Sequence, residues 1–544
     1  MIKRLKASKA ILYRLLEINS FTLVIHMVLL LISCQNGSSE HTKQVFYLNS
    51  SNGISSLDPA FARTQENIRA VNQLFNGLVQ LDDDLKIKDC LAKSWQISED
   101  GLLYTFKLKK GVFFHKHPSF KNNEDRIVTA RDFVFSFNRI LDPELASDGA
   151  WIFNGLVDTV SPFEAPNDST FIIKLQKPFA PFLNMLSMSY CYVVPEKVVQ
   201  NKQLDFGKNP IGTGPFKFSN WSEGIKLNFI RNDEYFEASE NYKIPYIDAV
   251  SISFIMSKQT ALLKYTQGSL SVFTGLESSY KDELLKANGE LQDKYGANHH
   301  LIKAPFLNTE YLAFNMESEQ FKNYTLRRAI NLAIDPNAMV VYLRNNVGHP
   351  AFGGFVPQGL PSHVSESNLK RNLEEASRLA AQLEPHEKKF TLTTTKDYLD
   401  LCVLAQNDLK AIGIEMKIDV LPSSMLKQQK SAGEVDFFRS SWIADYPDGE
   451  NYMACFYSKN KAPNGPNYTR YFNSEFDILY EELIKTTDEN KRIDLIHEME
   501  TILLNDLPFV LLFYDQSVWL KPKAMKGLKV NPLNHLDLRE VQLN

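Results

Sequence analysis

The chain has 544 residues, which is too long for one simple domain. Hydrophobic residues make up 44% and charged residues 23%, an ordinary composition for a globular protein. The formal net charge of −4 at pH 7 argues against a nucleic-acid partner, because phosphate binding needs a concentrated basic surface.

The N-terminus has the features of an export signal. Basic residues lie within the first 14 positions, and mostly apolar residues follow at 21–32. This stretch is shorter than the roughly 20 residues of a membrane-spanning helix and suits the roughly 7–15 of a signal-peptide apolar region. The motif LISC, ending at Cys34, resembles a bacterial lipobox. We therefore expect a signal peptide at 1–33, lipidation of Cys34 and a polar tether at 34–44. The alternative is an anchor helix with an incidental cysteine.

Strands and helices alternate along the rest of the chain. Strands are predicted where polar and apolar residues alternate, and helices where apolar residues recur at intervals of three and four. The predicted strands include 45–49, 171–175, 226–232, 414–421 and 508–520, and the predicted helices include 68–81, 129–141, 326–335, 374–383, 398–413 and 490–506. With many hairpin signals as well, the fold class is α/β or α+β with mixed sheets.

Local signals predict how several of these elements begin and end. Within 68–81, Gly77 is expected to end the first helix and to let a strand begin. Gly111 is expected to form the turn between two strands within 104–114. Thr129 is the expected N-cap of the next helix, with Asp132 three residues later.

Short motifs also occur in a characteristic order. They include SLDPA at 56–60, NGLV at 76–79, TARDFVFSFNRI at 129–140, IGTGPFKF at 211–218, LAFNM at 312–316, WIADYPDG at 442–449 and MKGLKVN at 525–531. In this order the motifs resemble the solute-binding proteins of peptide and nickel ABC importers, the class that includes oligopeptide- and dipeptide-binding proteins. The resemblance covers roughly residues 45–531.

The resemblance implies a periplasmic-binding-protein-like fold (type II, cluster C-like), in which two lobes joined by hinge strands close around a cleft. The implied boundaries are 45–77, 208–303 and 510–544 for lobe I, 78–207 for an inserted domain and 304–509 for lobe II. The glycines of the IGTGP turn would mark the return from the inserted domain, because glycine reaches backbone angles that other residues avoid.

The resemblance also implies a ligand site around WIADYPDG. In peptide-binding relatives, a W-x-x-D segment supplies the aspartate that pairs with the N-terminal ammonium of the ligand. Asp445 takes that position here, with Trp442 lining a side-chain pocket and Tyr446 beside it in the predicted ligand-binding set. The alternatives are a turn-capping role for Asp445 and a core position for Trp442.

Two further charged residues flank this motif. Some oligopeptide-binding relatives have an arginine at the position of Arg439, where it meets the carboxylate of shorter peptides. A guanidinium suits this role because its planar fork can hold a carboxylate through two hydrogen bonds. The alternative for Arg439 is a structural salt bridge. Asp448 is a competing carboxylate, but its place between a proline and a glycine favours a turn.

Other chemistry finds weaker support. The chain has no H-E-x-x-H, G-x-S-x-G or P-loop motif, so we expect neither catalysis nor a cofactor. The pair His115 and His117 leaves metal binding open, since a family branch binds nickel chelates. Cysteines after Cys34 are widely spaced and form no zinc or redox motif. The segment after Gly268 lacks an aspartate usual in the family, which puts a local turn in doubt.

The predicted protein is a lipid-anchored, monomeric solute-binding protein of the periplasm or cell envelope. It is expected to capture di- or oligopeptides and deliver them to the permease and ATPase subunits of an ABC importer. Alternatives are nickel-chelate or oligosaccharide binding by the same fold, a lipoprotein hydrolase, or a peptide sensor that does not transport.

Overall fold

The computed structural model describes residues 43–543. The predicted signal peptide and the lipidation of Cys34 lie outside the described residues. None of the described helices is long and apolar enough to span a membrane. From Val45 onward the chain forms one compact unit, and its sheets are built as follows.

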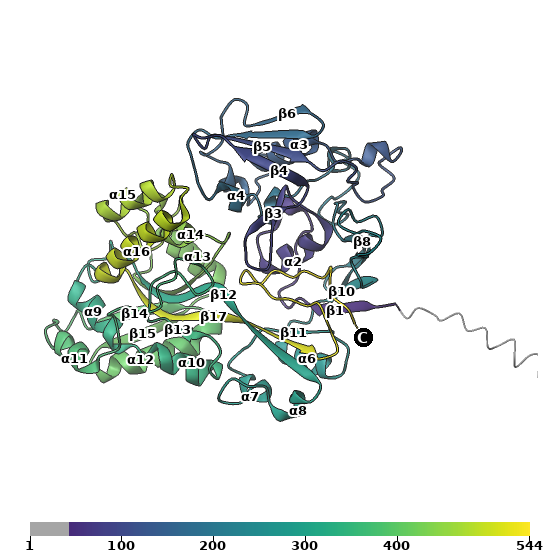
Figure 1. The fold of residues 1–544 in the computed structure, drawn as a ribbon. Coiled ribbons are helices and arrows are strands. Elements are labelled where there is room, and N and C mark those ends of the chain that lie inside the picture. The colour runs from purple at the N-terminus through teal and green to yellow at the C-terminus, as the bar shows by residue number, and fades with distance from the viewer. Residues whose placement is uncertain (1–42, 544) are drawn as a thin grey trace, which may run out of the picture. The chain divides into compact units, whose positions relative to one another are not determined.

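One four-stranded sheet joins two distant parts of the chain (Figure 1). Its strands, in spatial order, are β1 (Val45–Asn49), β10 (Ala249–Ser253), β9 (Lys226–Arg231) and β8 (Phe216–Ser222). On β9, Leu227 and Phe229 are buried whereas Lys226 and Ile230 are exposed, as the alternating pattern predicts.

A second four-stranded sheet carries a helix on one face. Its strands, in spatial order, are β4 (Ala92–Ile97), β5 (Leu103–Leu108), β7 (Thr170–Lys174) and β6 (Phe163–Asn167). Helix α3 (Ala130–Leu141) packs on this sheet through Phe137, whose ring centroid lies 5.4 Å from that of Phe171. The predicted cap is confirmed, because the Thr129 backbone N–H donates to the Asp132 carboxylate at 2.8 Å.

The largest sheet holds the two longest strands that the structure describes. Its spatial order is β11 (Phe273–Thr274), β17 (Phe509–Pro522), β12 (His299–Phe314), β16 (Phe437–Ile443), β14 (Lys389–Thr394) and β15 (Glu415–Val420), with β13 (His349–Pro350) also paired to β17. At about 3.3 Å per residue, β12 and β17 each extend for roughly 45–55 Å. Their pairing is irregular between Pro305 and Thr309, where proline has no N–H to donate to the ladder. They have the length and the local irregularity expected of hinge strands.

Apolar residues fill both faces of this sheet. Phe437 stacks on Phe314 with ring centroids 4.7 Å apart, in the core beneath α9 (Tyr324–Ala333) and α12 (Leu399–Ala411). Its neighbour Phe438 points to the opposite face and joins the core beneath α14 (Glu450–Met453) and α16 (Glu489–Asp506). Successive residues of β16 therefore face opposite sides of the sheet, which decides where the site residues point.

The helices and short strands complete the unit. The helices are α2 (Gln65–Leu74), α4 (Phe182–Met185), α5 (Glu196–Val199), α6 (Lys258–Thr266), α7 (Lys281–Leu284), α8 (Asp293–Gly296), α9 (Tyr324–Ala333), α10 (Pro336–Arg344), α11 (Leu373–Ala381), α12 (Leu399–Ala411), α13 (Ser423–Ala432), α14 (Glu450–Met453), α15 (Ser474–Leu483) and α16 (Glu489–Asp506). Strands β2 (Val79–Leu81) and β3 (Ile87–Asp89) pair with each other.

The structure tests three local predictions, which concern the first helix and the segments around Gly111 and Gly268. The first helix ends at Leu74, three residues before Gly77, and the strand expected after Gly77 is present at residues 79–81. Gly111 does adopt a left-handed φ of 73°, but the second strand predicted after it is reduced to one bridge, from Phe113 to Ile127. The turn at Gly268 is present, with φ of 73°, although the family's aspartate is missing.

The IGTGP turn owes its glycines to close packing, not to the unusual backbone angles that we expected. Neither Gly212 nor Gly214 has a positive φ. A Cβ on Gly212 would lie 2.0 Å from the carbonyl oxygen of Leu74, and one on Gly214 would lie 2.4 Å from the Leu74 carbonyl carbon. The turn therefore presses against the end of α2, where no larger residue fits.

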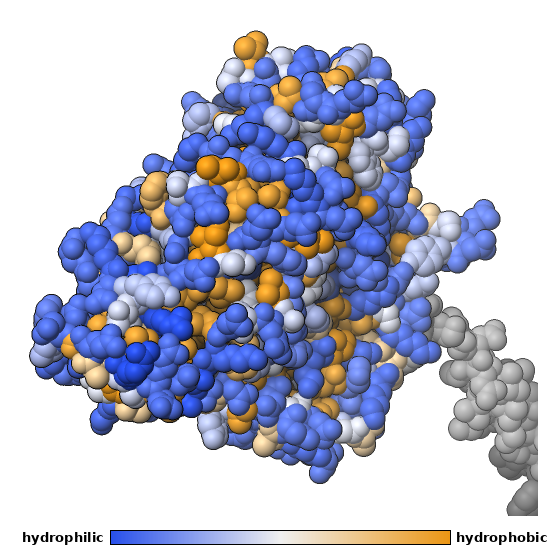
Figure 2. Space-filling view, turned by 60° about the vertical axis from the view of Figure 1, so that its left-hand side comes forward, coloured by the Kyte–Doolittle hydropathy of each residue, from blue (hydrophilic) through white to orange (hydrophobic). Residues whose placement is uncertain are grey.

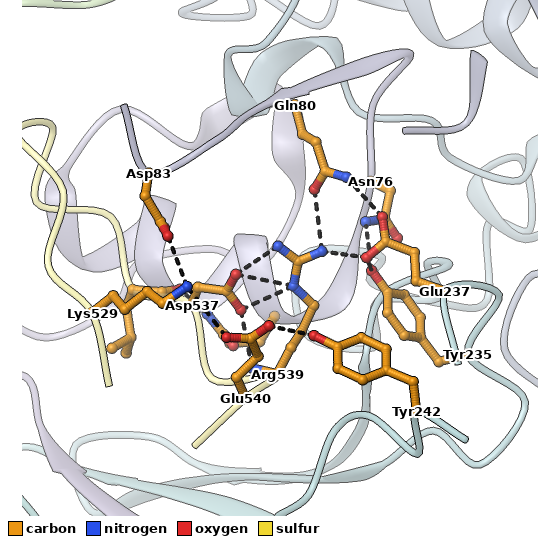
Figure 3. A network of polar contacts seen from close by, with 12 residues as sticks. Asn76, Gln80, Asp83, Tyr235, Glu237, Tyr242, Lys529, Asp537, Arg539 and Glu540 are labelled. Atoms are coloured by element: carbon orange, nitrogen blue, oxygen red, sulfur yellow. Dashed lines mark hydrogen bonds and ion pairs between the residues drawn. The ribbon is translucent and has the colours of Figure 1, made fainter. Parts of the chain in front are cut away.

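The C-terminal segment is held by a polar network around Arg539 (Figure 3). The Arg539 guanidinium pairs with Asp537, contacts the Gln80 side chain at 3.2 Å and forms an ion pair with Glu237. Lys529 adds a second link, at 2.7 Å to Asp83. These contacts join the end of the chain to segments around residues 80 and 237.

Candidate functional site

A cavity of about 310 Å³ separates α2 and the loop after β1 from strands β16 and β17. Its lining includes Arg69, Thr274, Ile443, Gln516 and Ser517, so distant parts of the chain contribute to one site. On the molecular face shown in Figure 2, apolar side chains gather in the middle, between mostly hydrophilic regions above and below. Small-molecule sites are typically concave and combine apolar walls with a few polar groups, and the lining of this cavity includes both kinds.

Strand β16 contributes Ile443 to this cavity, and the predicted site residues lie on this strand or just after it. It pairs antiparallel with β12, and the backbone N–H of Ala444 continues the pairing to the Leu307 carbonyl at 2.9 Å. Because side chains alternate, Arg439 and Ile443 follow one side of the strand, and Ile443 lines the cavity. Asp445 follows the end of β16, and its side chain is hydrogen-bonded to Asn451, which also accepts from Trp442.

Asp445 has a carboxylate without a cationic partner. Its side chain is exposed, and no ion pair to it occurs among residues 43–543. Even so, burial raises its pKa to about 6, partly offset by a hydrogen bond from Asn451. The Asp445 carboxyl group is therefore accessible to water, but the protein around it removes part of its hydration. Such a group favours a ligand cation.

This titration predicts pH-dependent binding of a cationic ligand. A neighbouring ammonium favours the carboxylate, so the Asp445 pKa falls on binding. The affinity for the cationic ligand should therefore be highest above pH 6, where Asp445 is ionised. It should decrease about tenfold per pH unit as the pH falls below 6. Calorimetry between pH 5 and 7 measures this slope. Asp445→Asn should remove the part of this pH dependence that is due to Asp445. Any pH dependence of affinity that is due to nearby Glu450, whose pKa burial raises to about 7, would remain. A flat profile in the wild-type protein would contradict the prediction.

The two aromatic residues of the predicted set are occupied within the protein. Trp442 faces the opposite side of β16 from Ile443, and its Nε1–H donates to Asn451 Oδ1 at 2.9 Å. Tyr446 is buried, and its hydroxyl donates to the Glu450 carboxylate. Both residues therefore hold the segment around Asp445 in place. This geometry favours the core alternative for Trp442.

Arg439 is engaged in a buried ion pair. Its guanidinium pairs with Glu310 on β12 and lies over the ring of Tyr398. The two charged side chains are only 11% and 4% exposed, respectively. The charge of Arg439 is therefore already compensated within the protein. Of the two alternatives for Arg439, the geometry favours the structural salt bridge.

Asp448 is also compensated. It accepts a hydrogen bond from the Glu450 backbone N–H at 2.9 Å and forms an ion pair with Arg492 at 2.6 Å. It therefore caps the turn into α14, as its sequence context favours. Of the two aspartates in this segment, Asp445 is the one that forms no ion pair among residues 43–543.

Two residues that sequence reasoning did not identify, Trp151 and Tyr190, lie near Asp445 and Tyr446. Trp151 stacks on Tyr446 with ring centroids 6.5 Å apart. Burial, and then the negative charges of Asp148 and Asp445, raise the pKa of the Tyr190 hydroxyl. Asp445 therefore lies near residues more than 250 positions earlier in the chain. No local motif marks Trp151 or Tyr190, because their role depends on how distant segments meet.

The histidines considered for metal binding contact backbone groups. His115 is buried, with Nε2 at 3.0 Å from the Gly214 carbonyl and Nδ1 accepting from the Gly212 N–H. His117 Nδ1 accepts from the Ser119 N–H. Among the described residues, no group of three or more His, Cys, Asp or Glu side chains could hold a metal ion. The described cysteines are free and buried.

Comparison with known proteins gives a consistent set of relatives. The model of "Bacterial extracellular solute-binding proteins, family 5 Middle" matches residues 86–464. Dipeptide-binding protein DppE of Bacillus subtilis (strain 168) is 24% identical over 543 residues, covering 94% of each chain. Heme-binding protein A of Haemophilus influenzae is 26% identical over 487 residues, covering 85% of each chain.

A solved structure matches the fold over most of the chain. The ABC transporter-associated periplasmic binding protein DppA from Helicobacter pylori, in complex with the peptide STSA, gives a TM-score of 0.76 at 26% identity. The match covers 93% of this chain and 99% of that one. The predicted mixed α/β, periplasmic-binding-protein-like fold is confirmed. The chain belongs to the bacterial extracellular solute-binding proteins of family 5.

Proposed function

We propose that this protein captures peptides outside the cytoplasm and delivers them to an ABC importer. The observation that carries the proposal is the carboxylate of Asp445, which forms no ion pair among residues 43–543 and follows Ile443 of the cavity lining by two residues. An unblocked peptide offers an ammonium group, which would compensate this charge on closure of the site. The names of DppE and of the peptide-bound H. pylori protein support this ligand class.

The peptide backbone supplies the remaining contacts. Its N–H and C=O groups can pair with exposed strand edges near the cavity, independently of side-chain identity. Trp442 and Tyr446 contribute by fixing the position of Asp445, whereas Arg439 would meet a ligand carboxylate only if Glu310 gave way. Two lobes with the boundaries predicted above would close around the peptide, with β12 and β17 as the hinge.

The location and partners follow from the same proposal. Lipidated Cys34 would anchor the protein to a bacterial membrane, with residues 34–44 as tether. The protein would act as a monomer that makes and breaks no bonds, since ATP hydrolysis would occur in the partner ATPase subunits. Its energetic contribution is the selective binding of the transported peptide.

A thermal-shift experiment tests the ligand class. A peptide that binds only the folded state stabilises it by about 2.7 kcal/mol at a free concentration 100 times Kd. A mixture of short peptides should therefore raise the Tm of the purified protein, whereas haemin, a nickel–histidine chelate and oligosaccharides should not. Stabilisation by haemin alone, or hydrolysis of the peptides, would contradict the proposal.

A further inference from the structure

Three cationic side chains line the cavity, and two of them are already paired. Lys258 Nζ lies 3.0 Å from Glu277 Oε1, and Arg344 forms an ion pair with Asp515. Arg69 forms no ion pair within the part of the chain that the structure describes. Its charge is therefore the one in this lining that a bound anion could compensate.

The surrounding residues hold the Arg69 guanidinium in a fixed orientation. Its central carbon lies 5.1 Å from the Trp519 ring centroid, and its Nε–H donates to the Asn534 carbonyl at 3.2 Å. Trp519 is itself fixed, because its Nε1–H donates to Asn534 Oδ1 at 3.0 Å. The terminal N–H groups of Arg69 make no hydrogen bond to the described residues. A fixed guanidinium fork of this kind suits a carboxylate.

The local charge supports the same conclusion. Burial lowers the pKa of Arg69 to about 10, opposed by Glu66, so the guanidinium remains charged at neutral pH. The Glu66 carboxylate accepts a hydrogen bond from Asn52 at 2.7 Å instead of pairing with Arg69. Ser517 adds a hydroxyl to the same lining, and its Oγ is buried without a hydrogen-bond partner in the described chain.

We propose that Arg69 binds a carboxylate of the peptide whose ammonium group is held by Asp445. This inference rests on the proposed function and adds to it a second charged contact. The segment that carries Asp445 reaches the cavity at Ile443, which lines it together with Arg69 and precedes Asp445 by two residues in the chain. The carboxylate is either the C-terminus of the peptide or an acidic side chain, and both sources offer the same chemistry.

Matched peptides distinguish this contact from general effects. Calorimetry compares alanine peptides of two to five residues as free acids and as C-terminal amides, and amides that carry one glutamate. Arg69→Gln should weaken the best-bound acidic peptide roughly 10- to 100-fold and leave neutral amides unchanged. Loss confined to free acids identifies the C-terminus as the bound group. Loss confined to glutamate amides identifies the side chain.

Two further variants keep the test decisive. Lys430 also lacks an ion pair among the described residues, but its Nζ contacts Ser440 Oγ at 2.9 Å and it is not part of the cavity lining. Lys430→Gln should therefore keep the wild-type preference for acids over amides. Arg69→Lys keeps the positive charge but not the planar guanidinium, so it should lose less affinity for acidic peptides than Arg69→Gln. If Arg69→Gln fails to fold, a loss of affinity in Arg69→Lys that is confined to acidic peptides tests the same contact.

The outcomes separate this inference from the proposed function. Equal losses for acids and amides in Arg69→Gln, or loss of the acid preference in Lys430→Gln alone, would overturn the role of Arg69 while leaving peptide binding intact. If the wild-type protein binds no free peptide at all, the proposed function itself fails, and the contact at Arg69 fails with it.

Discussion

Asp445→Asn should weaken binding of free-amine peptides about 100-fold and leave N-acetylated peptides almost unaffected. Removing one partner of a desolvated charge pair costs about 2–5 kcal/mol, because the other charge stays buried and uncompensated. An acetylated peptide carries no N-terminal ammonium and has nothing to lose from the substitution. Calorimetry with matched pairs of peptides measures the difference directly.

A matched control lies three residues away. Asp448→Asn makes the same chemical change in the same segment, but it removes an ion pair to Arg492. It should lower the Tm without changing the preference for free amines. In contrast, ligand-free Asp445→Asn should have an unchanged or higher Tm at pH 7, because a desolvated charge is removed. Equal losses for free and acetylated peptides in Asp445→Asn would exclude the ammonium role.

The second large effect concerns the pair of Arg439 and Glu310. Replacing either residue alone, as in Arg439→Ala or Glu310→Ala, should destabilise the protein by about 3–5 kcal/mol, because one buried charge then lacks its partner. Replacing both with residues of similar volume, Arg439→Met with Glu310→Gln, should cost much less. Urea unfolding of the ligand-free proteins measures these free energies.

The same variants test the ligand role that sequence comparison suggested for Arg439. If Arg439 also meets the carboxylate of short peptides, Arg439→Ala should weaken one peptide length far more than others. A structural pair should instead weaken all lengths alike. Single variants that unfold within about 1 kcal/mol of the wild type would show that the pair is not buried in solution.

Sequence reasoning predicted the fold better than it predicted the site. Local signals were enough for the capped helix at Thr129 and for many strands, since these depend on neighbours in the chain. Motif order predicted the family, now confirmed. The role of the IGTGP glycines was misread, because their contact with Leu74 joins segments about 140 positions apart, which backbone preferences do not report.

The charges at the site show the same limit. Asp445 and Arg439 differ by six positions and look equally available in the sequence. Glu310 compensates one and not the other, because the register of β12 and β16 sets Glu310 opposite Ser441 and so within reach of Arg439, two residues along the same face. Likewise, Arg69 is an ordinary residue of a predicted helix until the cavity and the partners of its neighbours are known.

The position of β17 has a consequence for how the molecule assembles. This strand lies between β11 and β12 in the largest sheet, yet it comes from residues 509–522. A chain that emerges N-terminus first must therefore wait for nearly its entire length before the middle of that sheet can form. Until then β11 and β12 lack the strand that joins them, so the largest sheet is completed only after nearly the whole chain has been synthesised.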